Sequence, residues 1–339
     1  MSLPTDVDTL IALAEGGDLR ALARLISVVE NDGHQAQQVV EHLYPRTGRA
    51  HIVGVTGAPG TGKSTLVNAI ARIYRQRGHR VGIVAIDPTS PFSGGALLGD
   101  RVRMRDLIGD PDVFIRSMAT RGSLGGLAHA TDDVVMILDA MGYDRILIET
   151  VGVGQAEVDI AASAHSVIVV EAPGLGDDVQ AIKAGVLEIA DIFVVNKADR
   201  EGADRTFLAL QTMLGLGPRQ VPHHGRQMSI EQEAPPSNWT PPILKTVATR
   251  GEGVDAVVDA IEHHREHLQT SGEGQHRETT RVRREIYRIL QDTLLTRLIE
   301  RVTPAVLDDV VHQVVARKMD PYTAAQRLIV RSETHLMAE

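Results

Sequence analysis

Residues 51–64 read HIVGVTGAPGTGKS, and this stretch decides how the rest of the chain is interpreted. The first six residues are mostly apolar and predict a buried strand. GAPGTGKS at 57–64 fits G-x-x-x-x-G-K-[ST], in which backbone N–H groups and the start of a helix surround a phosphate chain. Lys63 would neutralise the β- and γ-phosphates and the Ser64 hydroxyl could ligate Mg²⁺, whereas the alternative is a glycine turn that only tightens the junction. The predicted nucleotide-binding residues are Gly57, Ala58, Pro59, Gly60, Thr61, Gly62, Lys63, Ser64 and Thr65.

Short apolar runs alternate with longer amphipathic runs from residue 51 onward. Strands buried on both faces that alternate with helices predict a doubly wound, mostly parallel α/β sheet, with helices on both sides, over residues 49–268. The further strand-like runs lie at residues 80–86, 113–117, 144–149, 166–171, 191–196 and 242–247. The helix-like runs lie at residues 64–77, 126–141, 178–189, 201–214 and 254–268.

Helices are expected on either side of this domain. An N-terminal helical extension at residues 1–48 is predicted from apolar residues at helical spacing and from Asp18 as an N-cap. QTSGEG at residues 269–274 predicts a flexible linker. Residues 275–339 then predict a helical arm of three helices, with Asp320 capping the third. The arm's first helix carries an apolar stripe of Ile286, Ile289, Leu290, Leu294 and Leu298.

This arm is too small to enclose a core of its own. Its apolar stripes therefore need the main domain or another subunit to cover them. We expect the arm to be a dimerisation element and the protein to be a homodimer.

The composition excludes several classes of function. Lys and Arg total 35 against 44 Asp and Glu, and the net charge of −9 disfavours binding to nucleic acid. The chain has no cysteine, so disulfides, thiolate metal sites and a cysteine nucleophile are excluded. No signal-peptide pattern and no run of 18 apolar residues is present, so we expect a cytoplasmic protein without membrane association.

A second motif, NKAD at residues 196–199, follows an apolar strand-like run. A carboxylate at the end of a strand can accept hydrogen bonds from the ring N–H and the exocyclic amine of guanine, and adenine has no matching pair of donors. Asn196, Lys197 and Asp199 are therefore predicted to read the base. This motif selects GTP and GDP over ATP.

Carboxylates at strand ends predict a magnesium site. Asp87 and Glu149 each close a strand-like run, and Asp100 ends the glycine-rich stretch at 88–99. Mg²⁺ takes few direct protein ligands and keeps waters, so these acids would act partly through water, beside Ser64. Each acid alone could instead be a helix cap or a turn residue.

ETVGVGQ at residues 149–155 follows another strand-like run and only superficially begins a dinucleotide fingerprint, because position 157 is Glu. We interpret residues 152–155 as a switch whose backbone approaches the γ-phosphate, with Gln155 orienting the attacking water. Lys63, Glu149 and Gln155 are the candidate catalytic residues.

Two groups of histidines are candidate metal ligands. His223 and His224 lie in an irregular stretch at 215–242, which is interpreted as a surface excursion. His263, His264 and His267 lie on a predicted helix, where the last two can share a face. Because no Cys or further His completes either set, solvent-exposed histidines are the better interpretation.

Longer strings of sequence resemble one family. GAPGTGKS, DPTSPFSGGALLGDRVRM at 87–104, ATRGSLGGL at 119–127, ETVGVGQAE at 149–157, NKAD and RKMDPYTAA at 317–325 together resemble the MeaB/ArgK family. Its members are GTPases associated with methylmalonyl-CoA mutase and are also named LAO/AO transport system kinases. The likeness covers nearly the whole chain, and the strings at 87 and 149 are more specific than the P-loop.

The resemblance implies a homodimeric P-loop GTPase that chaperones an adenosylcobalamin-dependent mutase and controls cofactor loading. It assigns phosphate and Mg²⁺ binding to Lys63 and Ser64, and the metal site to Asp87, Asp100 and Glu149. GLGDDVQAIK at 174–183 resembles a switch through which the mutase stimulates hydrolysis. Its matching positions are Asp177, Gln180 and Lys183.

The chain departs from the family pattern in two places. The 215–242 excursion is longer than usual. TVAT at 246–249 stands where GTPases often carry a Ser-Ala pair whose backbone touches the base, so Ala248 is the matching contact.

Three other functions remain as alternatives. A kinase acting on an amino-acid transport protein would need an acceptor-binding signature, and none is visible. A nickel-insertion GTPase would need a set of Cys and His ligands that the chain does not supply. A non-enzymatic scaffold would not need the metal carboxylates. Among mutases, those acting on isobutyryl or ethylmalonyl skeletons stay open as partners.

Overall fold

The computed structural model describes residues 6–30, 34–87, 104–107, 109–119, 124–150, 163–174, 189–215 and 238–334 of the chain. By internal packing the chain divides into two compact units, Met1–Gln275 and His276–Glu339. Of the helices in the described part, none is both long enough and apolar enough to cross a membrane.

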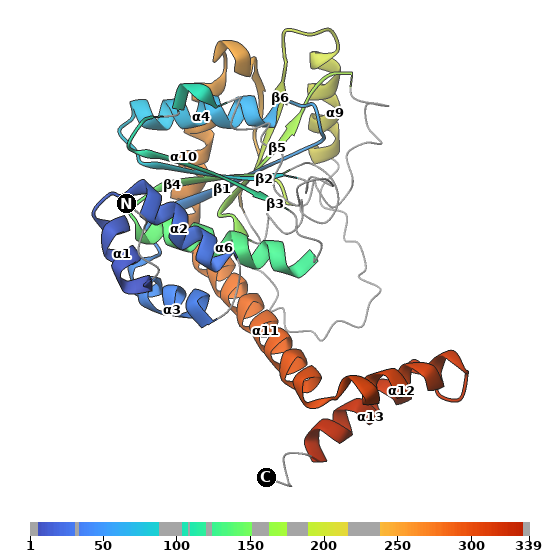
Figure 1. Cartoon of the computed structure of the whole chain (residues 1–339). Coiled ribbons are helices and arrows are strands. Elements are labelled where there is room, and N and C mark those ends of the chain that lie inside the picture. Colours follow the sequence, from blue (N-terminus) through green and yellow to red (C-terminus); the bar gives the residue numbers. More distant parts are fainter. Residues whose placement is uncertain are drawn as a thin grey trace. The chain divides into compact units, whose positions relative to one another are not determined.

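The described strands of the first unit form one seven-stranded sheet in which every pairing is parallel (Figure 1). The strand order is β3-β2-β4-β1-β5-β6-β7, which confirms the predicted doubly wound sheet. β1, β4 and β6 are buried along their whole length, as continuous apolar runs in a parallel sheet predict. The strands are β1 (His51–Thr56), β2 (Val81–Asp87), β3 (Val113–Ala119), β4 (Arg145–Glu149), β5 (Ser166–Glu171), β6 (Ile192–Asn196) and β7 (Ile243–Thr246).

Helices cover both faces of this sheet, and each face has its own apolar cluster. Along β1, Ile52 belongs to one cluster while Val53 and Val55 belong to the other, because side chains alternate between faces. One face packs against α4 (Lys63–Gln76) and α10 (Val254–Ser271). The other packs against α6 (Leu124–Ala140) and α9 (Ala203–Gly215), and Figure 1 shows α4 and α6 on opposite sides.

The N-terminal helices pack on the α6 side of the sheet and share its apolar cluster (Figure 1). Asp18 caps α2 as predicted, since its carboxylate accepts hydrogen bonds from the N–H groups of Arg20 (2.8 Å) and Ala21 (3.2 Å). An ion pair between Arg116 of β3 and Glu30 also ties this layer to the sheet. The helices are α1 (Val7–Glu15), α2 (Leu19–Val29) and α3 (His34–Leu43), followed by the short η1 (Tyr44–Arg46).

The stretch at 269–274, expected to be a flexible linker, is helical apart from one residue. α10 continues to Ser271, and α11 (Glu273–Arg301) begins two residues later. Gly272 separates them with a φ of +78°, a left-handed conformation that ends a helix and that glycine adopts without strain. Across the break, His267 Nε2 lies 3.2 Å from Glu273 Oε2. The stretch is therefore helical instead of irregular, while the break at Gly272 falls close to the boundary between the two compact units after Gln275.

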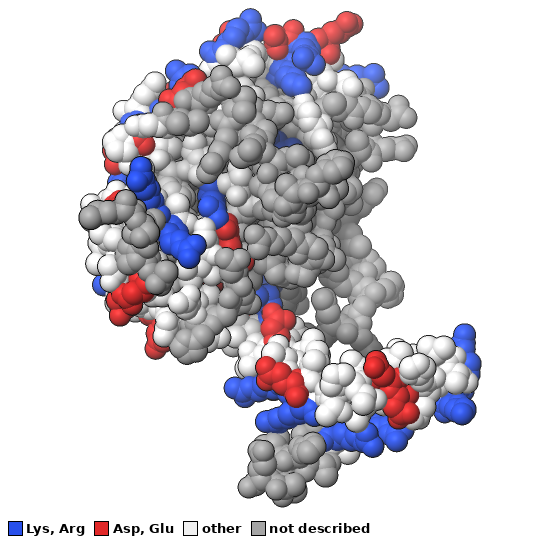
Figure 2. Space-filling model, in the orientation of Figure 1, with Lys and Arg blue, Asp and Glu red and all other residues white. Residues whose placement is uncertain are grey.

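The second unit consists of helices with almost no core. It contains most of α11, then α12 (Pro304–Val315) and α13 (Pro321–Thr334). Asp320 caps α13 as predicted, accepting from the N–H groups of Tyr322 and Thr323. Among its described residues only Val310 and Ala324 are buried. Figure 2 shows Lys and Arg side chains along this unit, with Asp and Glu side chains and uncharged surface between them.

Two sequence predictions fall outside the described residues. The helix expected at 178–189 is described only at its last residue, and the 215–242 excursion only at its ends. The returning end of the excursion is fixed to the sheet, because the Trp239 indole donates a 2.8 Å hydrogen bond to the carbonyl of Asp191.

Candidate nucleotide-binding site

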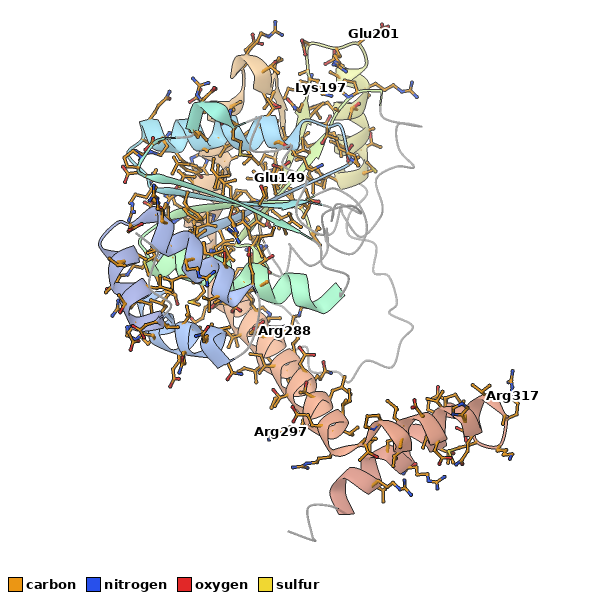
Figure 3. All side chains as sticks on the ribbon, in the orientation of Figure 1. Glu149, Lys197, Glu201, Arg288, Arg297 and Arg317 are labelled. Carbon is orange, nitrogen blue, oxygen red and sulfur yellow. The ribbon has the colours of Figure 1, made fainter. Side chains whose placement is uncertain are left out.

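The sequence motifs meet at one edge of the sheet. In a parallel sheet all strands end at the same edge, and here β1 lies between β4 and β5, where the direction of strand order changes. The P-loop follows β1, Glu149 ends β4, NKAD begins at the last residue of β6 and TVAT begins at the last residue of β7. Figure 3 labels Glu149, at the end of β4, and Lys197, directly after β6.

The P-loop is shaped by two glycines, and any other residue at either position would displace neighbouring atoms. Gly57 has a φ of +136°, and a Cβ there would lie 2.1 Å from the Val170 carbonyl oxygen of β5. Gly62 has a φ of +95°, and a Cβ there would lie 2.5 Å from Asn196 Nδ2. The loop thus passes close to two neighbouring strands and enters α4 at Lys63. A helix N-terminus reached through such a loop is a favourable place for an anion.

Lys63 is held inside this loop. Its Nζ donates to the carbonyl oxygens of Gly57 (2.8 Å) and Ala58 (3.1 Å), and the residue is 6% exposed. The ammonium group therefore lies within the turn that would surround a phosphate chain. From there it could neutralise phosphate charge.

Ser64 and Glu149 form the buried oxygen pair of the site. The Ser64 hydroxyl donates to Glu149 Oε1 at 2.6 Å, and both residues are almost fully buried. A hydroxyl beside a carboxylate supplies the hard oxygen ligands that Mg²⁺ prefers, so the residues present fit that ion. Asp87 ends β2 at the same edge, but its side chain lies outside the described set.

Asn196 joins the three loops of the site. Its Nδ2 donates to the Thr61 carbonyl oxygen at 2.8 Å, which holds the P-loop. Its Oδ1 accepts from Thr246 Oγ1 and from the Ala248 N–H, both at 3.1 Å, which holds the loop after β7. Ala248, expected to touch the base through its backbone, therefore gives its N–H to Asn196.

Lys197 crosses from NKAD to the P-loop. Its backbone has a φ of +56°, which is uncommon for a residue other than glycine. Its Nζ donates to the Gly60 carbonyl oxygen at 2.5 Å. The side chain thus spans the space between the base-reading motif and the phosphate loop.

A cavity of about 350 Å³ opens next to these residues, on the side of β6 and β7. Asp199 lies in its wall, and Asp199 Oδ2 is 3.3 Å from Arg250 Nη2. Sequence reasoning missed Arg250, because its position depends on how the loop after β7 folds. The cavity is lined by Ala198, Asp199, Lys245, Thr246, Val247, Arg250, Glu252 and Gly253.

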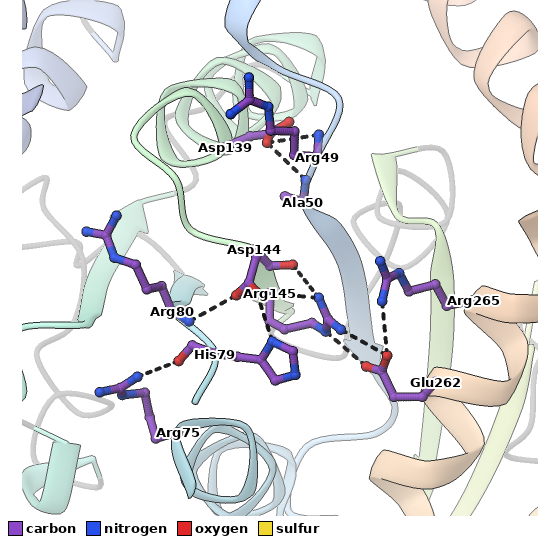
Figure 4. Close-up of polar contacts among 10 residues, drawn as sticks. All are labelled: Arg49, Ala50, Arg75, His79, Arg80, Asp139, Asp144, Arg145, Glu262 and Arg265. Atoms are coloured by element: carbon purple, nitrogen blue, oxygen red, sulfur yellow. Dashed lines mark hydrogen bonds and ion pairs between the residues drawn. The ribbon is translucent and has the colours of Figure 1, made fainter. Parts of the chain in front are cut away.

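The opposite edge of the sheet is also polar, but its groups are occupied with one another (Figure 4). Arg145 at the start of β4 makes two hydrogen bonds of 2.9 Å to the Glu262 carboxylate of α10. The neighbouring Asp144 accepts from the Arg80 N–H at 2.9 Å and lies 2.8 Å from His79 Nδ1. The first pair connects the start of β4 to α10, the second connects the residues that precede β2 and β4, and both serve the fold.

His264 corrects the expectation of a solvent-exposed histidine face. It is completely buried, with Nδ1 2.7 Å from Ser166 Oγ and Nε2 3.3 Å from Asp191 Oδ1. His263 is exposed as expected. Within the described part of the chain, no group of three or more His, Asp and Glu side chains is placed to hold a metal ion.

Several predicted residues lie outside the described ones. These are the metal-site candidate Asp100, the candidate catalytic Gln155, the partner-switch residues Asp177, Gln180 and Lys183, and the histidines His223 and His224.

Comparison with known proteins identifies the family. A family model described as "Methylmalonyl Co-A mutase-associated GTPase MeaB" matches residues 22–303, which is most of the chain. The chain belongs to the MeaB family. This MeaB-family chain is 48% identical to a putative GTPase of Pyrococcus abyssi over 95% of its own length and 96% of that protein. It is therefore a P-loop GTPase, as its sequence motifs predict.

Two further comparisons extend this result. The MeaB-family chain is 30% identical to the mouse protein named methylmalonic aciduria type A homolog, mitochondrial, over 85% of this chain and 70% of that one. The crystal structure of a LAO/AO transport system kinase matches with a TM-score of 0.69 and 23% identity, and covers 96% of this chain and 98% of its own. At that identity the structural likeness shows a shared fold.

Proposed function

We propose that this MeaB-family GTPase is a nucleotide-controlled chaperone of an adenosylcobalamin-dependent acyl-CoA mutase, with methylmalonyl-CoA mutase as the first candidate. The observation that carries the proposal is the family match over residues 22–303, because the family is described by its association with that mutase. The chaperone would assist cofactor loading and protect the mutase.

The nucleotide would lie along the carboxyl edge of the sheet. The P-loop amides and Lys63 would bind the phosphates, and Asn196, Lys197 and Asp199 would position and read guanine. Ser64 would hold a Mg²⁺ ion together with Asp87, Asp100 and Glu149, and this ion would neutralise charge on the phosphates. The 2.6 Å contact between Ser64 and Glu149 supports this assignment.

Hydrolysis would be linked to movement of the segments at 88–100 and 150–157. Each segment begins directly after a residue that ends a strand and is assigned to the metal site. These residues are Asp87 of β2 and Glu149 of β4. Thr150 is anchored, since its N–H donates to the Val55 carbonyl oxygen (3.1 Å) and its hydroxyl to Thr56 Oγ1 (3.0 Å). A change at the phosphate would therefore act on both segments, and on the second of them next to a fixed point.

The mutase would accelerate the reaction. Phosphoryl transfer mainly needs positioning and charge neutralisation, and Gln155 would orient the attacking water. A contact supplied by the partner through Asp177, Gln180 and Lys183 would complete the arrangement. The isolated chain would accordingly turn over slowly. We also propose that it acts as a homodimer through residues 275–339.

The test is GTP turnover with and without a cobalamin-dependent acyl-CoA mutase, using γ-labelled GTP. We expect the mutase to raise the turnover rate, and the label to appear as free phosphate. Lys63→Ala should abolish turnover, whereas Arg24→Ala removes one positive charge from an exposed site on α2 and should have no effect. An unchanged rate in a complex that demonstrably forms would contradict the partner assignment, and label transferred to protein would favour the kinase alternative.

A further inference from the structure

Arg250 is placed between two carboxylates at the rim of the cavity that contains Asp199. Its Nη2 lies 3.3 Å from Asp199 Oδ2, and its Nε lies 3.2 Å from Glu252 Oε1. The arginine side chain is 53% exposed and that of Asp199 47% exposed, so both can be reached from solvent. One guanidinium group thus connects the NKAD motif to the loop after β7.

The backbone of that loop fixes where Arg250 stands. The Val247 N–H donates to the Glu252 carbonyl oxygen at 3.0 Å and closes the loop. The Ala248 N–H is held by Asn196, and Gly253, with a φ of +74°, passes so close to β7 that a Cβ would lie 2.2 Å from the Lys245 carbonyl oxygen. Arg250 is therefore presented from a constrained loop to Asp199.

We propose that Arg250 is a positioning residue for guanine selection, which orients the Asp199 carboxylate toward the base. The inference rests on the proposed base-reading role of Asp199. It adds a residue outside the NKAD motif to the specificity of the site.

The chemistry of a carboxylate allows Arg250 and guanine to bind Asp199 together. Two carboxylate oxygens offer about four acceptor positions, and the ion pair with Arg250 approaches Oδ2 alone. Guanine needs one acceptor on each oxygen, for its N1–H and its 2-amino group. A carboxylate that can rotate freely presents both oxygens to the base only part of the time. The fork of Arg250, anchored at Glu252, restricts that rotation.

The test compares binding of GDP and inosine diphosphate by calorimetry in magnesium buffer. Hypoxanthine lacks the 2-amino group, so it uses one bond to Asp199 where guanine uses two. We expect Arg250→Ala to lower the ratio of GDP to inosine diphosphate affinity by about two- to fivefold, the range for one partly exposed ion pair. Arg250→Gln, which keeps a polar side chain without the charge, should lower the ratio in the same way.

If Arg250 only attracts the phosphates, Arg250→Ala should weaken the binding of GDP and of inosine diphosphate equally. Such a result would overturn the proposal. An unchanged ratio, or tighter GDP binding, would also overturn it, the latter because Arg250 would then compete with the base. Arg20→Ala is the matched control, since it removes one positive charge from an exposed position on α2 and should leave the ratio unchanged.

Asp199→Asn separates failure of the inference from failure of the proposed function. This variant should lose affinity for GDP and gain affinity for xanthosine diphosphate, whose C2 carbonyl can accept a hydrogen bond from the amide. In that background, Arg250→Ala should leave xanthosine diphosphate affinity within about twofold, because the charged partner is gone. If Asp199→Asn does not change base preference, the base-reading assignment is wrong. If it does, and Arg250→Ala leaves the GDP ratio intact, only the role of Arg250 is wrong.

Discussion

Asn196 shows how one buried side chain can organise a site made of three loops. Its amide donates to the P-loop at Thr61 and accepts from Thr246 and Ala248 beyond β7. An aspartate of the same shape has no donor for the Thr61 carbonyl oxygen, and a leucine would leave all three partners unsatisfied. The amide is thus required by geometry before any nucleotide is considered.

The close approach of Gly62 to Asn196 gives a prediction at this scale. In Gly62→Ala the new Cβ would lie 2.5 Å from Asn196 Nδ2, so the amide must move and lose its bond to Thr61. The left-handed backbone adds about 1–2 kcal/mol of strain. We expect GTP affinity, measured by calorimetry, to fall at least about tenfold.

Gly78→Ala is the matched control for this substitution. Gly78 has a φ of +85°, but a Cβ there meets nothing within 4 Å. The control therefore carries the backbone strain without the clash, and it should lower the free energy of unfolding by about 1–2 kcal/mol without changing GTP affinity. Equal GTP affinities in the two variants would contradict the role given to Asn196.

Sequence predicts some of these residues better than others, for a physical reason. The P-loop glycines and Lys63 follow one another along the chain, so spacing alone places the glycines between β1 and α4 and the lysine at the start of α4. Arg250 and His264 depend on partners far away in the sequence, such as Ser166 for the histidine. A spacing of three or four residues says that two histidines share a helix face, but not whether that face is buried.

At the scale of elements, a buried polar chain connects α10 to three strand starts. His51 at the start of β1 lies 2.9 Å from Ser166 of β5, which lies 2.7 Å from His264 of α10. Asp191, just before β6, contacts His264 and accepts the Val167 N–H at 2.8 Å. A buried polar group is tolerated only when it is hydrogen-bonded, so these residues fix the position of α10 on the sheet.

Protonation of His51 should therefore oppose folding. Burial, the neighbouring His165 and the Arg145 guanidinium lower the pKa of His51 well below 6.5. The unfolded chain binds this proton near pH 6.5 and the folded chain does not, so the stability contributed by neutral His51 is present above pH 6.5 and is lost as the pH falls below it.

We expect the free energy of unfolding of His51→Gln, measured with urea, to fall less steeply than that of the native chain between about pH 6.5 and 5. The difference in slope should approach about 1.4 kcal/mol per pH unit for one proton. His263→Gln removes an exposed histidine from the same region and should keep the native slope. If the free energy of unfolding falls equally steeply with pH in His51→Gln and in the native chain, His51 is not the cause of the pH dependence.

The elements themselves were predictable to different degrees. The β1 and β5 boundaries follow from apolar runs that match the strands residue for residue, because both faces of these strands are buried. The strand order could not be predicted in this way, since β4 pairs with β1 across almost one hundred residues and no local pattern encodes that pairing. Polar, glycine-containing composition predicted a linker at 269–274, yet only Gly272 departs from helix.

At the scale of the whole molecule, the two units differ in how they bury apolar surface. The first unit has an apolar cluster on each face of its sheet. In the second unit, α11 buries no side chain, while Ile286, Ile289, Leu290 and Leu294 of the predicted stripe are each 46–63% exposed. A helix with such a stripe gains stability when another apolar surface covers it. A second copy of the same stripe would satisfy this requirement with two-fold symmetry.

This gives a prediction for the association state. A glutamate placed in the stripe would have to be buried without a partner in a dimer, so Leu294→Glu should shift the full chain from dimer to monomer in light scattering at micromolar concentration. Gln291→Glu adds the same charge on α11 at an exposed polar position and should stay dimeric. If the native chain is monomeric at that concentration, or if both variants dissociate equally, the stripe is not the dimer interface. Selective dissociation of Leu294→Glu would assign the exposed apolar residues of α11 to contact between two copies of this chain.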